Sequence, residues 1–140
     1  MKNGHGMGGI HTAVALWCED PAAAKAQYGP IASWTTSEIT DMWGLFYYKV
    51  NFNGDISRWD VSSVQYMGYM LDGATSFNGD LSQWNVSNVT HMSHMLQGAT
   101  SFTHQLGGAW STSTASMTGM FENCPGSIAG KTNDAYGTSE

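Results

Sequence analysis

The sequence contains few charged residues, and basic residues are especially scarce. Charged residues make up 11% of the 140 positions, whereas an average soluble domain has about 25%. The five basic residues are scattered along the chain: Lys2, Lys25, Lys49, Arg58 and Lys131. A nucleic-acid-binding surface needs clustered positive charge to neutralise phosphates. Because the formal net charge is −6, we expect no nucleic-acid partner.

Cysteines and long apolar runs are also scarce. Cys18 and Cys124 are the two cysteines, which is too few for a disulfide scaffold, and we expect both to be free thiols. A membrane-spanning helix needs about 20 consecutive apolar residues, and the sequence has no such run. Residues 1–17 lack the apolar core and the cleavage site of a signal peptide. We therefore expect a protein that does not span a membrane.

The dominant feature that is present is an internal repeat with a period of 25 residues. FNGDISRWDVSSVQYMGYMLDGATSF (52–77) is followed by FNGDLSQWNVSNVTHMSHMLQGATSF (77–102), and the two share Phe77. Four units are visible, and the first and the fourth are weaker than the middle two. The apolar columns are Ile31/Ile56/Leu81/Leu106, Trp34/Trp59/Trp84, Met42/Met67/Met92/Met117, Leu45/Met70/Met95/Met120, Phe46/Leu71/Leu96/Phe121 and Phe52/Phe77/Phe102. We predict that these columns stack to form the hydrophobic core.

Within one unit, the pattern predicts an extended segment followed by a helical turn. LSQWNV (81–86) places apolar residues on one side of an extended stretch, and VTHMSHML (89–96) has apolar spacings of three and four. Gly- and Ser-rich stretches such as QGATS then reverse the chain direction. The sequence therefore predicts an α/β solenoid, a leucine-rich-repeat-like stack of about four 25-residue coils. Each coil would contain a short parallel strand, a turn and a short helix.

We predict a single domain with three parts. Residues 1–30 are a Gly-rich N-terminus and a helical cap, in which Asp20 is the N-cap, Pro21 is the first helical residue and Gly29 lies at the end. Residues 31–125 form the four-coil repeat region, and residues 126–140 form a C-terminal cap or tail. The helical cap would cover the open edge of the first coil, since exposed strand edges promote aggregation.

Trp110 breaks the repeat register by one position. Strict spacing places Ala109 in the tryptophan column and Trp110 one place later, and a shift of one residue turns a side chain to the opposite face. We expect a local bulge at Gly107–Gly108 to return Trp110 to the core. The alternative is that Trp110 is a surface aromatic residue near the C-terminal end.

At these residues the sequence resembles the BspA-like leucine-rich-repeat family. MLDGATSFNGDLSQWNVSNVTHM (70–92) matches the family pattern, and the match continues in weaker form from residue 31 to residue 121. The lead-in TAVALWCEDPAAAKAQYGPIASW is similar to the segment that precedes these repeats in members from microbial eukaryotes. The resemblance implies a repeat scaffold that often lies on cell surfaces and serves adhesion or protein contact. It implies no reaction and no catalytic residues.

Seven aromatic residues lie at non-core positions of the repeats, and we predict that they form a partner-binding surface. They are Trp43, Tyr47, Tyr48, Tyr66, Tyr69, His91 and His94. The repeat columns place them on one flank, and aromatic side chains are enriched at the centres of protein interfaces. The alternative is ordinary partial burial under loops.

Three further motifs suggest ligands, but each also has a structural interpretation, which we favour. The NGD motifs at 53–55 and 78–80 could hold calcium, or they could form turns linked by an asparagine ladder. His91 and His94 could ligate a metal, or they could be solvent-facing. Asn85 and Asn88 match the pattern of N-glycosylation acceptors, which chance could also supply in an Asn- and Ser-rich repeat.

The sequence therefore predicts a non-enzymatic repeat scaffold that mediates protein contact, as a surface adhesion module or as a structural subunit of a larger assembly. Its partner would be another protein or a second copy of the chain. The alternative function is a glycan-binding or other surface-ligand-binding module. We predict no catalytic residues, metal or cofactor. The predicted location is extracellular or at the cell surface, and the alternative is an intracellular or organellar subunit.

Overall fold

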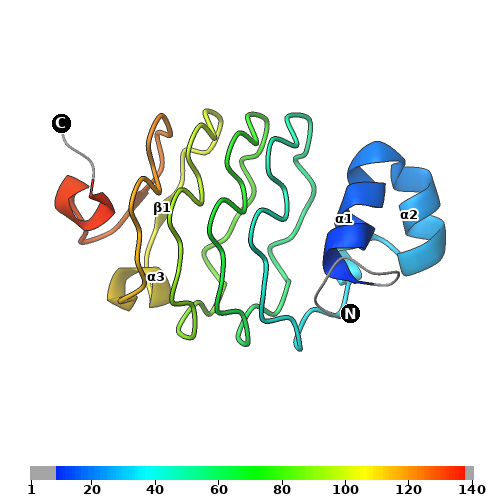
Figure 1. Cartoon of the computed structure of the whole chain (residues 1–140), viewed down its shortest axis with the longest axis horizontal. Coiled ribbons are helices and arrows are strands. Elements are labelled where there is room, and N and C mark those ends of the chain that lie inside the picture. The colour runs from blue at the N-terminus through cyan, green and yellow to red at the C-terminus, as the bar shows by residue number, and fades with distance from the viewer. Residues whose placement is uncertain (1–8, 138–140) are drawn as a thin grey trace.

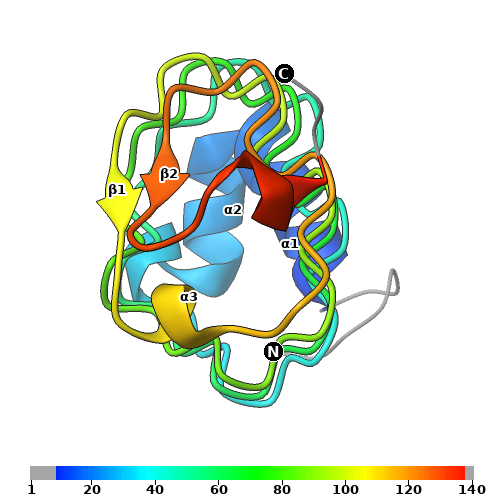
Figure 2. The same ribbon diagram turned by 90° about the vertical axis from the view of Figure 1, so that its left-hand side faces the viewer.

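The computed structural model describes residues 9–137. The elements in chain order are α1 (Ile10–Glu19), α2 (Pro21–Tyr28), the 3₁₀ turn η1 (Ile31–Ser33), β1 (Gln105–Leu106), α3 (Ala109–Thr112), β2 (Ser127–Ile128) and the 3₁₀ turn η2 (Asn133–Tyr136). In Figure 1, α1 and α2 lie at one end and the C-terminal turn lies at the other. The repeat units run side by side between them. Viewed from the C-terminal end, the repeats largely overlie one another (Figure 2).

The predicted fold class is wrong. The described residues are mostly coil, with 22% helix and 7% strand. Their only sheet consists of β1 and β2, which pair in parallel and do not close. A solenoid of four coils, each with its own strand and helix, is therefore not present in residues 9–137. Between successive repeats, parallel pairing is reduced to single bridges at Asp41–Tyr66, Tyr66–His91 and His91–Ser116.

The predicted repeat helices do not form because their backbone amides bond sideways. Met67 N donates to His91 O at 2.9 Å, and Leu71 N donates to Met95 O at 2.8 Å. An α-helix would instead direct these amides to carbonyls four residues earlier in the same segment. Tyr69 has a φ of +55°, and a left-handed residue of this kind ends a right-handed helical turn. The apolar spacings of three and four therefore identified the buried residues correctly. The helices that they predicted are turns in the structure.

The predicted core columns are confirmed, except that Phe121 in the last repeat is only partly buried. Trp59 is 3% exposed and Trp84 is 2% exposed, and the Met and Phe columns lie beside them in the core. Each tryptophan also bonds across the repeats. Trp59 Nε1 donates to Ile31 O at 2.8 Å, and Trp84 Nε1 donates to Ile56 O at 3.0 Å. The same side chain therefore fills the core and satisfies a buried carbonyl of the preceding repeat.

Trp110 belongs to the core, as predicted, although a short helix rather than a bulge places it there. The side chain is fully buried, and Nε1 donates to Leu81 O at 3.0 Å. Its ring stacks with Trp84 at 6.5 Å between centroids. The additional residue is accommodated by α3, which begins after Gly108 with a φ of +57°.

The predicted N-terminal helical cap is present. Asp20 is the N-cap of α2, and its carboxylate accepts a hydrogen bond from Ala23 N at 3.1 Å. Pro21 opens the helix and Gly29 ends it with a φ of +82°. Helix α1 precedes α2 and spans ten residues. Residues 1–8 of the predicted Gly-rich N-terminus lie outside the described residues.

The C-terminal segment forms an ordered cap as far as residue 137. Strand β2 pairs with β1, and Tyr136 of η2 is 5% exposed. Ile128 N donates to the Tyr136 hydroxyl at 3.1 Å, and Gly119 N donates to Tyr136 O at 2.7 Å. Residues 138–140 of the predicted cap or tail lie outside the described residues.

Candidate functional site

The predicted aromatic surface is solvent-exposed in its N-terminal half. Trp43 is 45% exposed, Tyr47 49%, Tyr48 58% and Tyr66 40%. With Val50, they are the large hydrophobic side chains that are exposed among residues 9–137. The remaining predicted members are His91, which is exposed, and Tyr69 and His94, which are half-buried.

Five of these side chains form a continuous cluster, which we call the aromatic patch. Tyr69 lies at its centre, with its ring centroid 5.3 Å from that of Trp43, 6.3 Å from that of Tyr47 and 4.8 Å from that of His94. Tyr48 joins through Tyr47 at 4.6 Å. The structure therefore brings together residues from three successive repeats.

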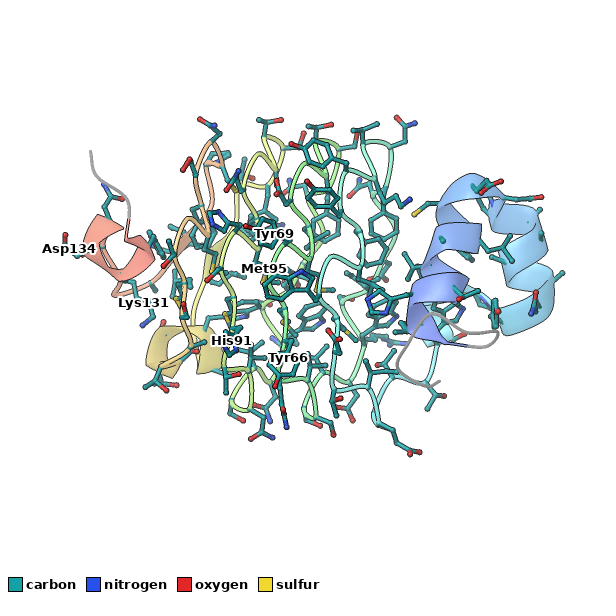
Figure 3. The ribbon with its side chains drawn as sticks, in the orientation of Figure 1. Tyr66, Tyr69, His91, Met95, Lys131 and Asp134 are labelled. Atoms are coloured by element: carbon teal, nitrogen blue, oxygen red, sulfur yellow. The ribbon has the colours of Figure 1, made fainter. Side chains whose placement is uncertain are left out.

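Tyr66 and His91 form a separate pair, with ring centroids 5.4 Å apart. Their backbones are joined by one of the parallel bridges. In the view of Figure 3, this pair lies below Tyr69. The predicted surface is therefore one cluster of five rings and one nearby pair.

Glycines in neighbouring repeats make room for the rings of the patch. A Cβ atom at Gly68 would overlap the Trp43 ring, and one at Gly73 would lie 2.6 Å from the Tyr48 ring. A Cβ at Gly119 would lie 2.5 Å from the ring of His94. Each of these rings therefore lies flat over the next repeat, and its orientation depends on the absence of a side chain there.

The rings enclose a shallow hollow of about 350 Å³, lined by Trp43, Gly44, Tyr47 and Tyr69. The Trp43 and Tyr69 rings meet at 53°, so the hollow has tilted aromatic walls. Aromatic side chains at exposed sites offer a large apolar surface and, in tyrosine, a hydroxyl group that can form hydrogen bonds. The hollow is suited to receive one side chain or one small ring.

A buried carboxylate lies near the patch. Asp72 is 4% exposed, and burial raises the pKa of its carboxyl group, whereas the neighbouring His94 lowers it. The ring nitrogen Nδ1 of His94 in turn contacts Gln97 Oε1. The sequence analysis did not identify Asp72. The equivalent positions of the other repeats hold Tyr47, Gln97 and Glu122, and this column of polar side chains next to the aromatic residues could have indicated it.

The asparagine ladder that we favoured for the NGD motifs is present, but residues 53–55 and 78–80 do not form turns. Asn53 Oδ1 accepts a hydrogen bond from Asn78 N at 3.0 Å, and Asn78 Oδ1 accepts one from Thr103 N at 3.1 Å. The carboxylate of Asp55 accepts the hydroxyl and amide hydrogens of Ser57, and these bonds lower the pKa of Asp55. These oxygens therefore already accept hydrogen bonds within a repeat or between repeats.

His91 and His94 do not face one partner. His91 Nδ1 contacts Thr90 Oγ1 at 2.8 Å, and His94 contacts Gln97. His91 lies at a parallel β-bridge and His94 lies in a turn. Residues 9–137 contain no cluster of three or more His, Cys, Asp or Glu side chains suited to a metal. The solvent-facing interpretation fits the exposed His91 and only partly fits His94.

The glycosylation-acceptor asparagines are both exposed and both have structural bonds. Asn85 Oδ1 accepts a hydrogen bond from Ser87 N at 3.1 Å, and Asn88 Nδ2 donates to Ser62 O at 2.7 Å. A glycan on Asn88 would replace one hydrogen of that donor nitrogen. Glycosylation stays a prediction at both positions.

The two thiols are unpaired, as predicted. Cys18 lies in α1 and Cys124 lies beside the C-terminal segment, where Gly126 N contacts its sulfur, and both are half-buried. Burial raises the pKa of both thiols, so they are mainly uncharged at neutral pH.

No helix in residues 9–137 is long and apolar enough to cross a membrane.

The family of the chain follows from a match over most of its length. A family model described as "Mycoplasma protein of unknown function, DUF285" matches residues 20–133. The chain belongs to this family. The DUF285 match covers α2, all the repeats and the aromatic patch, and it is compatible with the resemblance to BspA-like repeats. No curated protein and no solved structure matches the chain.

Proposed function

We propose that this DUF285 chain is a non-enzymatic contact module that binds another protein through its aromatic patch. The observation that carries the proposal is the connected set of five rings, in which the exposed Trp43, Tyr47 and Tyr48 join the half-buried Tyr69 and His94 at 4.6–6.3 Å between centroids. Trp and Tyr are the residues that most often dominate the binding energy of protein interfaces. The resemblance to BspA-like repeats supports the same function and suggests a location at the cell surface.

The patch is favourable for binding because its rings already support one another. Ordering a side chain on binding costs about 0.5–1.5 kcal/mol. Trp43 and Tyr48 lie flat over Gly68 and Gly73, and Tyr69 contacts three other rings. Part of the ordering cost is therefore already met in the free protein. A partner would gain most of its contact energy from the ring faces.

The charge balance favours a different protein over a second copy of the chain. With a formal net charge of −6, two copies repel one another at long range, whereas a neutral or basic partner is not repelled. The partner that fits best presents an apolar side chain for the hollow between Trp43 and Tyr69, with neutral or basic residues around it.

Site-specific photocrosslinking in the source cells would test this proposal. A benzophenone amino acid in place of Tyr47 should give a discrete protein adduct, and the same group in place of the exposed Arg58 should not. The partner identified in this way would then be titrated with purified chain. Trp43→Ser combined with Tyr47→Ser should weaken its affinity at least about tenfold, and Arg58→Ser should leave it unchanged. Adducts from both positions, or equal affinities, would contradict the proposal.

A glycan is the second candidate ligand, because the hollow of about 350 Å³ between Trp43, Tyr47 and Tyr69 has room for a sugar ring. Sugar rings can place their apolar faces against aromatic side chains, and the tyrosine hydroxyls can form hydrogen bonds. Binding of the chain to a glycan array, lost in Tyr47→Ser and retained in Arg58→Ser, would favour this function over protein contact.

A further inference from the structure

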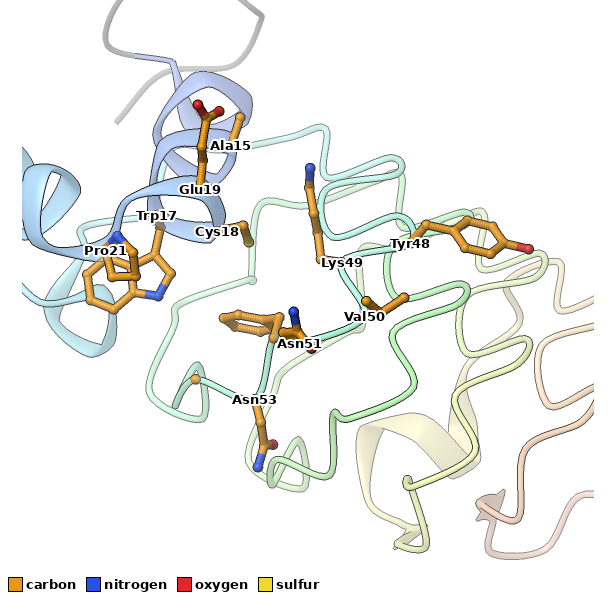
Figure 4. Close-up of a pocket in the computed structure, with 12 residues that line it drawn as sticks. Ala15, Trp17, Cys18, Glu19, Pro21, Tyr48, Lys49, Val50, Asn51 and Asn53 are labelled. Atoms are coloured by element: carbon orange, nitrogen blue, oxygen red, sulfur yellow. The ribbon is translucent and has the colours of Figure 1, made fainter.

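A separate cavity of about 440 Å³ lies where the N-terminal helices meet the first repeat. Figure 4 shows Trp17, Cys18 and Glu19 on the helix side and Lys49, Val50 and Asn51 on the repeat side. Small-molecule sites in proteins usually have about 300–1,000 Å³. The cavity is therefore large enough for a compact organic ligand.

The repeat side of this cavity departs from the pattern of the other repeats. The first repeat has Lys49-Val50-Asn51, where the next two have Ala-Thr-Ser, at 74–76 and 99–101. Ala74 and Ala99 are fully buried in the core, so Lys49 occupies a column that is apolar in the next two repeats. Lys49 therefore brings a positive charge, and Asn51 an amide, to the side of the first repeat that faces the N-terminal helices.

Lys49 is the positive group of the cavity, and its charge is not neutralised. Its Nζ atom makes no hydrogen bond or ion pair with another residue in the range 9–137. The positive charge of Lys49 opposes the rise in the pKa of Cys18 that burial causes. Glu19 is exposed at the helix side. An ammonium group in a partly enclosed site favours an anion.

Trp17 and Phe52 supply the apolar lining. Phe52 is 6% exposed, and Trp17 is half-buried and packs edge-on against Trp34 with centroids 5.8 Å apart. The Cys18 thiol is mainly uncharged at neutral pH, because burial raises its pKa. Cys18 therefore adds polarizable, neutral surface to the cavity.

We propose that this cavity binds a small organic anion with a flat apolar body, such as an aromatic carboxylate or sulfonate. The anionic group pairs with the Lys49 ammonium, and the ring lies against Trp17 and Phe52. The Asn51 amide is available to donate a second hydrogen bond. This site is distinct from the hollow of the aromatic patch, and it would add a small-molecule ligand to a protein-contact module.

The probe for this proposal is the aromatic sulfonate 8-anilinonaphthalene-1-sulfonate. The two thiols act as internal reporters, since Cys18 lines this cavity and Cys124 lines a different one beside the C-terminal segment. Saturating probe should slow the alkylation of Cys18 by iodoacetamide at least about fivefold, because only the unoccupied fraction reacts. The alkylation of Cys124, followed by mass spectrometry in the same sample, should keep its rate.

Variants then test the role of the charge. Lys49→Met should weaken probe binding about tenfold in a fluorescence titration, whereas Lys25→Met on the exposed face of α2 should have no effect. A second variant restores the repeat sequence, with Lys49→Ala, Val50→Thr and Asn51→Ser. It should fold, because the other repeats contain these residues, and it should lose the protection of Cys18.

Three results would overturn the proposal: unchanged affinity in Lys49→Met, equal protection of both cysteines, or no protection of Cys18. Trp43→Ser combined with Tyr47→Ser should leave Cys18 protection intact, since neither residue lines the cavity. Protection of Cys18 therefore tests anion binding in the cavity, independently of the affinity measurements that test partner binding at the aromatic patch.

Discussion

Single residues in this protein often serve two neighbouring repeats, and Trp84 is an example. Its ring stacks on Trp110, and its Nε1 satisfies Ile56 O. We expect Trp84→Ala to lower the free energy of unfolding by about 3–5 kcal/mol, the range for truncating a buried large aromatic residue. Trp84→Phe keeps most of the apolar contact and should cost about 1–3 kcal/mol, the cost of leaving a buried acceptor unsatisfied. Urea denaturation of both variants measures the two costs.

If Trp84→Ala unfolded at the same urea concentration as the wild type, the tryptophan column would not be part of the core. The sequence alone indicated this column, because three tryptophans at steps of 25 have no simpler explanation than stacking. The hydrogen bonds of the indole nitrogens were not predictable, since they depend on where the preceding repeat places one carbonyl.

Asp72 should make the protein less stable as the pH rises from acid to neutral. Its folded pKa lies above the usual pKa of an aspartate, mainly because burial disfavours the carboxylate. A raised folded pKa contributes stability below the unfolded pKa, and this contribution is lost as the pH rises through the folded pKa. We therefore expect Asp72→Asn to increase the melting temperature at pH 7 and to have a smaller effect near pH 4.

Asp80→Asn is a control with the opposite sign. Hydrogen bonds from Ser82 lower the pKa of Asp80, so its carboxylate stabilises the fold above the unfolded pKa and loses this effect as the pH falls. Asp80→Asn should therefore lower the melting temperature at pH 7. Melting curves of both variants at pH 4 and pH 7 would separate the two cases, and the same sign of change at pH 7 would contradict the assignment.

At the scale of the elements, each repeat contains a succession of tight turns whose backbone forms hydrogen bonds with the adjacent repeats. Amides of the 67–73 segment alternate between bonds to the next repeat and bonds to their own turn, as Met67 and Met70 illustrate. Left-handed residues allow this alternation, and several are not glycine, for example Tyr69 and His94. Such residues are not recognisable from a helical spacing of apolar residues, which is why the predicted helices and strands were wrong.

Gly73 and Gly98 occupy equivalent positions of two repeats, and together they test whether a glycine in the turn is needed to position the Tyr48 ring. Their φ angles are +74° and +72°, but a Cβ at Gly73 would collide with the Tyr48 ring, whereas one at Gly98 has no neighbour closer than 3.7 Å. Gly98→Ala should cost about 1–2 kcal/mol for a left-handed alanine. Gly73→Ala should cost more in urea denaturation, because it also displaces Tyr48.

The ring contribution can be isolated with a double-mutant cycle. In a Tyr48→Ser background, Gly73→Ala and Gly98→Ala should cost the same. If the two costs differ as much without the ring as with it, Gly73 does not support the position of Tyr48. The hollow of the patch depends on such contacts between a ring and a glycine of the next repeat. The positions of the aromatic residues in the sequence indicated the surface, but they could not indicate which rings contact one another.

At the scale of the whole molecule, the repeats need a cover at each end. The helices α1 and α2 cover the first repeat, and their caps were readable from Asp20, Pro21 and Gly29, because capping chemistry is local. The segment that contains β2 and η2 covers the last repeat, and no comparable capping signal marked it in the sequence. Its contacts, such as Gly119 N with Tyr136 O, join residues whose spacing follows no repeat.

Tyr136 is therefore the residue on which the C-terminal cover depends. It is 5% exposed, contacts Phe121 at 5.0 Å between ring centroids and accepts a hydrogen bond from Ile128 N. We expect Tyr136→Ala to cost about 3–5 kcal/mol, as for other buried aromatic residues. Tyr136→Phe keeps the ring and should cost about 0.5–1.5 kcal/mol for one hydrogen bond.

The two variants should also differ in solution behaviour. Loss of the cover would expose the amides and carbonyls of the last repeat, and exposed edges of this kind recruit other chains. Tyr136→Ala should therefore show concentration-dependent association in size-exclusion chromatography with light scattering, and Tyr136→Phe should elute like the wild type. If Tyr136→Ala were equally stable and monomeric, η2 would be an appendage, and the last repeat would be covered by β2 alone.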